Sequence, residues 1–309
     1  MTFHSGFVAI VGRPNVGKST LLNRLVGQKI AITSPVMQTT RHRIKGVVTT
    51  RKGQVVFLDT PGFSKALDKL GNYLTDEASA ALSEADALVV VVDGTQPPGK
   101  GDAWVISQVL AQAKPANRFV LLLMNKVDRL KSNPQKRAEH RLAYVALFEG
   151  YANLQTLLVS ARTGKQTDGI ADTLLRRLPE GPAYYDEDAV TDQRMREITA
   201  ELIREQVLHN TQEEIPHSVA VGIDIFDESD PALVKIKATL YVDQESQKGI
   251  LIGKGGDMIR TIGTGARRDI ERMVERSVYL DLKVKLKKNW RKDPQFLKSL
   301  GLAPPAVEQ

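Results

Sequence analysis

Short apolar runs alternate with amphipathic helical stretches over the first 180 residues of the chain. This alternation predicts an α/β domain whose mostly parallel, doubly wound sheet is covered by helices on both faces. The runs assigned to strands are residues 7–11, 44–50, 55–59, 88–93, 119–125 and 156–159, and helical patterns begin at Lys18, Tyr73, Asp102, Pro134 and Gly169. Such a fold binds ligands in the loops beyond the carboxyl ends of its strands, so the chemistry is expected there.

A second domain is predicted after Leu178-Pro179-Glu180-Gly181-Pro182, because prolines and a glycine so close together cannot continue a helix. We place the first domain at residues 1–180 and the second, with a C-terminal tail, at residues 186–309. The later pattern predicts a helix from a Thr191 cap towards His209, strands over 218–225 and 233–241, a short apolar helix, a helix over 258–276 and a strand over 278–286. This order of elements indicates an α+β domain.

Composition agrees with a two-domain protein of the cytosol. A chain of 309 residues is longer than one core usually serves, and the absence of cysteine excludes a disulfide framework and thiolate zinc sites. The longest apolar runs have six residues, far fewer than the roughly 20 that cross a bilayer, and the N-terminus lacks a signal-peptide pattern. We therefore expect a cytoplasmic location.

The net charge of +7 is unevenly distributed along the chain. Residues 186–245 contain 5 Lys and Arg against 15 Asp and Glu, whereas residues 248–298 contain 14 against 6. The basic stretch is either a solvated face or a surface for a polyanion.

A phosphate-binding loop follows the first predicted strand. Its sequence is Gly12-Arg13-Pro14-Asn15-Val16-Gly17-Lys18-Ser19-Thr20, which has P-loop spacing in the strand-to-helix setting that this motif requires. The glycines let backbone N–H groups wrap the phosphates, Lys18 reaches the β- and γ-phosphates, and Ser19 ligates Mg²⁺. The loop therefore predicts a nucleotide site with magnesium.

The base is predicted by Asn125-Lys126-Val127-Asp128, which closes another strand. The Asp128 carboxylate accepts hydrogen bonds from the ring N–H and exocyclic amine of guanine, whereas adenine has no matching pair of donors. We expect Asn125 and Lys126 to brace the loop and cover the base, and Ser160-Ala161-Arg162 to contact guanine through the backbone. The predicted ligand is GTP or GDP, which disfavours an ATP-driven motor.

The metal site is predicted from two further segments. Asp59-Thr60-Pro61-Gly62 ends the third strand and places a carboxylate opposite the P-loop, where it holds Mg²⁺. The Gly62 N–H is expected to contact the γ-phosphate, so that hydrolysis releases the following loop. A threonine hydroxyl completes the shell, and Thr40 is preferred over Thr39. The predicted metal ligands are Ser19, Thr40 and Asp59.

Together, the order and spacing of these motifs resemble the translation-factor-related GTPases and, within them, the Era family. The resemblance extends over essentially the whole chain, because the second half is similar to the type II K-homology (KH) domain of that family. It implies a GTP-hydrolysing switch that binds single-stranded 16S ribosomal RNA and assists small-subunit assembly. A monomer is expected. Arg162 departs from the lysine that is common at this position.

Hydrolysis is assigned to Lys18, Gly62, Thr40 and Asn15. Ras-like proteins orient the attacking water with a glutamine after the glycine of the third motif, but Phe63 stands here, so intrinsic hydrolysis should be slow. Related GTPases with asparagine at the position of Asn15 hold potassium there, and such a cation would neutralise transition-state charge. The alternatives are that Asn15 only stabilises the loop, or that Arg41 or Arg43 acts as an internal arginine finger.

RNA binding is predicted for a glycine turn and the cations around it. A Gly-x-x-Gly turn lets a nucleic-acid backbone approach closely, and KH domains use it to clamp about four nucleotides. The predicted RNA-binding residues are Gly253, Lys254, Gly255, Gly256, Lys248, Arg260, Arg267 and Arg268, with Lys283, Lys285 and Lys287 outward on the last strand. The alternative is a signalling GTPase whose second domain docks protein partners or the inner face of the cell membrane.

Overall fold

The computed structural model describes residues 2–36, 39–62, 69–130 and 133–302. By their internal contacts these residues form two units. The first comprises the described residues within 1–31, 37–65 and 74–192, and the second those within 32–36, 66–73 and 193–309. Each unit has a sheet and an apolar core of its own. Among the described helices, none combines the length and apolar character needed to cross a bilayer.

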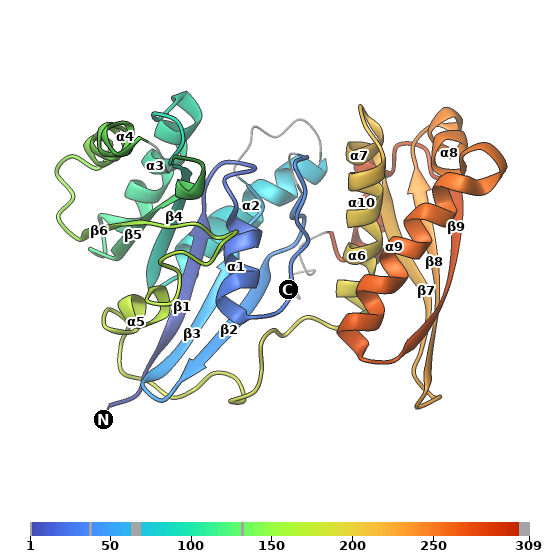
Figure 1. Ribbon diagram of the computed structural model, residues 1–309, viewed down its shortest axis with the longest axis horizontal. Coiled ribbons are helices and arrows are strands. Elements are labelled where there is room, and N and C mark those ends of the chain that lie inside the picture. Colours follow the sequence, from blue (N-terminus) through green and yellow to red (C-terminus); the bar gives the residue numbers. More distant parts are fainter. Residues whose placement is uncertain (1, 37–38, 63–68, 131–132, 303–309) are drawn as a thin grey trace. The chain divides into compact units, whose positions relative to one another are not determined.

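The first unit contains a six-stranded sheet with the order β2-β3-β1-β4-β5-β6 (Figure 1). Its strands are β1 (His4–Val11), β2 (Ile44–Thr50), β3 (Gly53–Asp59), β4 (Ala87–Asp93), β5 (Phe119–Asn125) and β6 (Leu154–Leu158). All neighbouring strands are parallel except β2, which pairs antiparallel with β3. The helices are α1 (Lys18–Val26), α2 (Lys69–Glu84), α3 (Lys100–Ala113), α4 (Pro134–Ala146) and α5 (Ile170–Leu175), with a 3-10 turn, η1 (Val127–Leu130). Of α2, residues 74–84 belong to this unit.

Two apolar clusters cover opposite faces of this sheet, because successive side chains of a strand point to opposite sides. In β1, Val8 and Ile10 join a cluster that contains residues of α1 and α5. The alternate residues Ala9 and Val11 join a cluster that contains residues of α2, α3 and α4. Figure 1 shows these helices on the two sides of the strands. The predicted doubly wound, mostly parallel α/β fold is confirmed.

Several predicted element ends were wrong by a few residues. β1 begins at His4, before the apolar run, and β6 begins at Leu154. α2 begins at Lys69 rather than Tyr73. α3 begins at Lys100, because the carboxylate of Asp102 accepts a hydrogen bond from the Gly99 N–H and thereby caps the helix from its third residue.

The second unit contains a three-stranded sheet with the order β7-β8-β9. The strands are β7 (Ala220–Asp227), β8 (Leu233–Val242) and β9 (Ser277–Leu286); β7 runs antiparallel to β8, and β9 runs parallel to it. The helices are α6 (Met195–Asn210), α7 (Ile215–Ser218), α8 (Glu245–Ile252), α9 (Asp257–Val274) and α10 (Pro294–Ser299), with 3-10 turns η2 (Lys254–Gly256) and η3 (Trp290–Lys292). The predicted α+β order of helix, two strands, two helices and strand is confirmed, and α7, η3 and α10 are additions to it.

One core holds the second unit together. It contains buried residues of α6, α9 and all three strands, and it also includes Ile32 from the short segment 32–36. Trp290 is fully buried and donates its indole N–H to the Ser218 carbonyl at 2.7 Å. Trp290 therefore packs in the core of the second unit.

The predicted Thr191 cap was wrong. Thr191 lies in the first unit, where its hydroxyl donates to the Lys45 carbonyl at 2.7 Å. α6 begins four residues later, and its N-terminus is capped by Glu197, whose carboxylate accepts the Arg194 N–H at 3.2 Å. The domain bounds at 180 and 186 stay a prediction.

Candidate nucleotide site and nucleic-acid interface

The P-loop joins β1 to α1 and encloses the ammonium group of Lys18. This side chain is 6% exposed, and its Nζ donates to the carbonyls of Gly12 and Arg13, both at 3.1 Å. Burial lowers the pKa of Lys18, and the nearby charge of Asp59 opposes that shift. A buried cation bound mainly by loop carbonyls is poised to exchange them for an anionic ligand.

Gly17 allows the P-loop to pass close to the base-side loop. Its backbone is left-handed, with φ +100°, and a Cβ atom there would lie 2.4 Å from Nδ2 of Asn125. Only glycine meets both conditions without strain. The P-loop glycine therefore lets the strand-to-helix turn and the loop after β5 pack together.

A cluster of hard oxygen atoms lies beside Lys18. The Ser19 hydroxyl donates to Oδ2 of Asp59 at 2.7 Å and lies 2.9 Å from Oγ1 of Thr40. Burial raises the pKa of Asp59 to about 6, although Lys18, Ser19 and Thr40 counteract it. Asp59 is completely buried, and no hydrogen-bond partner for its second oxygen, Oδ1, is found among the residues that the structure describes. Two hydroxyls and an incompletely bonded carboxylate fit Mg²⁺, and Thr40 is the threonine that reaches Ser19.

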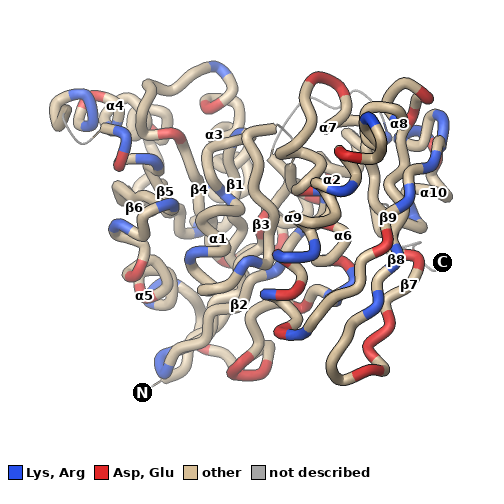
Figure 2. Tube along the Cα trace, turned by 45° about the vertical axis from the view of Figure 1, so that its right-hand side comes forward, with Lys and Arg blue, Asp and Glu red and all other residues tan. Residues whose placement is uncertain are grey.

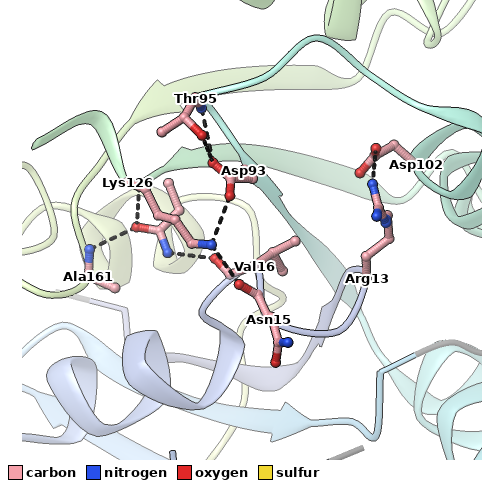
Figure 3. Close-up of polar contacts among 9 residues, drawn as sticks. Arg13, Asn15, Val16, Asp93, Thr95, Asp102, Lys126 and Ala161 are labelled. Carbon is pink, nitrogen blue, oxygen red and sulfur yellow. Dashed lines mark hydrogen bonds and ion pairs between the residues drawn. The ribbon is translucent and has the colours of Figure 1, made fainter. Parts of the chain in front are cut away.

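Asn125 connects three loops of the site. Its Nδ2 donates to the Val16 carbonyl in the P-loop at 2.8 Å. Its Oδ1 accepts the N–H groups of Lys126 at 2.8 Å and Ala161 at 2.9 Å (Figure 3). The three loops that the sequence assigns to phosphate and base are thus joined at one buried amide.

Asp128, the residue predicted to read guanine, is braced by the loop after β6. Its Oδ1 accepts the Ser160 hydroxyl, and its Oδ2 accepts the Arg162 guanidinium, each at 2.7 Å. Burial favours a higher pKa for Asp128, but the hydrogen bonds from Ser160 and Arg162 outweigh it and lower the pKa. The carboxylate is therefore ionised at neutral pH and oriented as an acceptor.

Arg162 and Arg13 make contacts that the sequence did not indicate. Arg162, expected to contribute only its backbone, forms an ion pair with Asp128, although its side chain is 72% exposed. Arg13 points to α3, where its guanidinium contacts the buried carboxylate of Asp102 at 2.8 Å (Figure 3). Only the backbone of Arg13 takes part in the phosphate loop, through the carbonyl that Lys18 contacts.

The remaining predicted nucleotide residues lie where the motifs place them. Thr60 is buried and donates its hydroxyl to the Ile10 carbonyl at 3.0 Å, which ties the end of β3 to β1. Gly62 approaches the P-loop, since a Cβ atom there would lie 3.1 Å from the Pro14 nitrogen and 3.2 Å from Nζ of Lys18. Thr20 lies in the first turn of α1, and Pro61 is buried. Phe63 is outside the described residues.

Asp93 is a site residue that sequence reasoning missed. It ends β4, and its Oδ2 accepts the Lys126 ammonium at 2.8 Å. The signal was present, because the run Val89-Val90-Val91-Val92 ends in an aspartate at the same edge of the sheet as Asp59. Nothing in the local pattern shows, however, which side chain it meets.

In the second unit, η2 and the two helices beside it carry the predicted nucleic-acid residues. Gly253, Gly255 and Gly256 have positive φ angles of 74°, 61° and 82°, and a Cβ at either of the last two would meet open space. Lys254 is exposed, and no ion pair is found for it among the described residues. The turn therefore presents an open backbone and a cation.

The flanking cations are exposed or partly exposed and only loosely paired. Lys248, Arg260 and Arg267 contact acidic residues three or four positions away on their own helices, at 3.3, 2.9 and 4.0 Å. Such surface pairs contribute little and leave the charges available to a ligand. Arg268 is exposed on α9. Figure 2 shows further Lys and Arg positions beside α8 and along β9.

Comparison with known proteins decides the family. A family model described as 50S ribosome-binding GTPase matches residues 7–126, and one described as KH domain matches residues 214–291. The chain is 46% identical to GTPase Era from Nostoc sp. over 97% of its length and 90% of that relative. It is 46% identical to GTPase Era from Leuconostoc citreum, with 97% of each chain covered. The chain belongs to the GTPase Era family.

Solved structures of Era agree in fold. An Aquifex aeolicus Era variant bound to GDP and AlF4⁻ matches with TM-score 0.89 and 37% identity, covering 97% of this chain and all of that one. Era in complex with MgGDPNP and nucleotides 1506–1542 of 16S ribosomal RNA matches with TM-score 0.89 and 36% identity, covering 97% and 99%. The predicted family, the two-domain fold class and the GTPase class of this Era-family chain are confirmed.

Proposed function

We propose that this Era-family chain is a GTP-hydrolysing switch that binds single-stranded 16S ribosomal RNA and assists small-subunit assembly. The observation that carries the nucleotide half is the buried Lys18 beside the Ser19, Thr40 and Asp59 oxygens, at the mouth of the P-loop. The relative solved with MgGDPNP and 16S ribosomal RNA supports the same assignment.

The nucleotide is held at two ends by different chemistry. P-loop N–H groups and Lys18 bind the phosphates, while Ser19, Thr40 and Asp59 would hold Mg²⁺. Bound there, Mg²⁺ would neutralise charge on the β- and γ-phosphates. At the other end, Asp128 accepts the two guanine donors, and Asn125 holds its loop against the P-loop and Ala161.

Hydrolysis depends on positioning water and compensating charge. Lys18 reaches the phosphates. The Gly62 N–H contacts the γ-phosphate, and the Thr40 hydroxyl completes the magnesium shell beside it. Asn15 has a left-handed backbone at φ 63°, and its side chain is directed away from Lys126 (Figure 3). We assign the Asn15 side chain as a ligand of a potassium ion beside the phosphates. Of the two candidate arginine fingers, Arg43 forms an ion pair with Glu84, with Nη1 of the arginine 2.5 Å from Oε2 of the glutamate. Arg41 is buried.

The RNA half rests on the exposed turn Lys254–Gly256 and the cations around it. The two open glycines, Gly255 and Gly256, let a sugar-phosphate backbone approach. Positive charge is supplied by Lys254, Lys248, Arg260, Arg267 and Arg268. We further propose a cytoplasmic location. Peripheral association with the inner face of the membrane would appear as cofractionation with membrane vesicles.

The nucleotide half is tested with purified protein and Mg²⁺ in competition binding of guanine, xanthine and adenine nucleotides. Asp128→Asn should weaken GTP binding and permit xanthosine triphosphate, because the amide NH2 would face the exocyclic amine of guanine, donor against donor, whereas xanthine has a carbonyl oxygen there that accepts from it. An unchanged preference for GTP would disprove the assignment of Asp128.

The RNA half is tested by the anisotropy of a labelled RNA with the sequence of nucleotides 1506–1542 of 16S ribosomal RNA. Lys254→Asp with Gly255→Asp should abolish a salt-dependent affinity, since charge is reversed and the turn is closed. Lys298→Asp, an exposed lysine on α10, is the matched control and should bind like the wild type. Binding that is absent or insensitive to salt in the wild type would contradict the proposal.

A further inference from the structure

The Lys126 ammonium is held between two elements far apart in the sequence. It donates to Oδ2 of Asp93, at the end of β4, at 2.8 Å and to the Asn15 carbonyl, in the P-loop, at 2.7 Å. Figure 3 shows Asp93, Lys126 and Asn15 in one line of contacts. Asp93 is itself fixed, because its Oδ1 accepts the Thr95 N–H at 3.0 Å and the Thr95 hydroxyl at 2.6 Å.

Asn15 and Lys126, which this hydrogen bond joins, both have unfavourable backbone conformations. Asn15 has φ 63° and Lys126 has φ 65°, in the left-handed region that residues with a Cβ atom rarely adopt. Such conformations persist only where surrounding contacts impose them. The hydrogen bond from Lys126 to Asn15 joins these two loops directly, so whatever fixes the ammonium also stabilises both conformations.

Asp93 is the carboxylate that fixes it. The side chains of Asp93 and Lys126 are 25% and 22% exposed, so their attraction is only partly screened by water. Burial favours a higher pKa for Asp93, but the hydrogen bonds from Lys126 and Thr95 outweigh it and lower the pKa. At neutral pH the contact is an ion pair between a carboxylate and an ammonium.

We propose that Asp93 is a positioning residue for nucleotide retention, which fixes the Lys126 ammonium on the Asn15 carbonyl and so holds the base-side loop against the P-loop. This inference rests on the nucleotide site proposed above. It predicts that losing Asp93 speeds the release of GDP and GTP equally, because the contact lies on the base side and does not involve the metal cluster. The competing view is that Asp93 serves only the local turn with Thr95.

The test measures the dissociation rates of fluorescent GDP and of a fluorescent, non-hydrolysable GTP analogue from the Mg²⁺-loaded, full-length protein. Asp93→Asn keeps the size of the side chain and replaces a charge-assisted hydrogen bond by a neutral one. Both dissociation rates should rise by about tenfold. Asp86→Asn is the matched control, because this carboxylate precedes β4 and accepts the Phe7 N–H at 2.8 Å. Its rates should stay within about twofold of wild type.

A double-mutant cycle separates positioning from a purely local role. In a Lys126→Met background, Asp93→Asn should add less than about twofold, because its partner is gone. Thr95→Val provides the same comparison with the carboxylate retained and should give a smaller increase, again only when Lys126 is present. It keeps the test decisive if Asp93→Asn fails to fold.

The outcomes distinguish this inference from the proposed function. If the wild-type protein retains guanine nucleotides but Asp93→Asn releases them at the wild-type rate, only the role of Asp93 is overturned. The same holds if Asp93→Asn has an undiminished effect in the Lys126→Met background. If the wild-type protein retains no guanine nucleotide, the proposed function and this inference fail together.

Discussion

Substitution of Gly17 by alanine should largely abolish nucleotide binding. A Cβ at this position would lie 2.4 Å from Nδ2 of Asn125, much closer than real Cβ contacts, so the amide must move. Asn125 makes three hydrogen bonds, to the Val16 carbonyl and from the N–H groups of Lys126 and Ala161. Moving it therefore disturbs the P-loop and both loops on the base side.

The expected magnitude follows from these contacts. A left-handed backbone costs an alanine about 1–2 kcal/mol, and each of the three hydrogen bonds contributes about 1 kcal/mol. A loss of roughly 4 kcal/mol corresponds to a Kd for GDP that is about a thousandfold higher.

Gly27→Ala is the control for this measurement. Gly27 has a similar left-handed backbone, at φ +77°, but its Cβ would meet no atom within 4 Å. It should lose about 1 kcal/mol of stability and bind GDP like the wild type. Isothermal titration with GDP and Mg²⁺ measures both variants. If Gly17→Ala binds within about tenfold of the wild type, or if both variants lose affinity equally, the packing argument is refuted.

Three further predictions concern hydrolysis, stability and pH. GTP hydrolysis measured by phosphate release should be faster in potassium than in sodium, and Asn15→Ala should remove the difference; equal wild-type rates would contradict the potassium assignment. Trp290→Ala should lower the free energy of unfolding of the second unit by about 3–5 kcal/mol in urea denaturation, because a fully buried ring and its bond to Ser218 are lost; a loss under about 1 kcal/mol would contradict this. The preference for GTP over ATP, measured by competition, should be constant from about pH 8 to pH 5. A carboxylate whose pKa is lowered stays ionised until the pH falls through that pKa, and the pKa of Asp128 is lowered below its usual value of about 3.9. A preference that declined already between about pH 7 and pH 5 would count against this role of Asp128.

The elements and motifs of this chain were largely predictable because they are local. Alternation of apolar runs located the strands of both sheets, with some ends wrong by a few residues. Helix starts were wrong where caps such as Asp102 and Glu197 decide them. The P-loop and Asn125-Lys126-Val127-Asp128 carry their chemistry in contiguous residues, so the nucleotide site was predictable without coordinates. The roles of individual site residues stay predictions until they are measured.

The sequence by itself determined the α/β and α+β domains, the guanine nucleotide motifs and the family, since each is encoded in spacing along the chain. The tertiary structure alone decided which distant residues meet. Asp93 reaches Lys126 because β4 pairs with β5 in a register that sets Asp93 opposite Asn125. Likewise, Arg13 contacts Asp102, Thr191 contacts Lys45, and Ile32 enters the core of the second unit. Strand order and packing fix such contacts over tens to hundreds of residues, and no local pattern of polar and apolar positions records them.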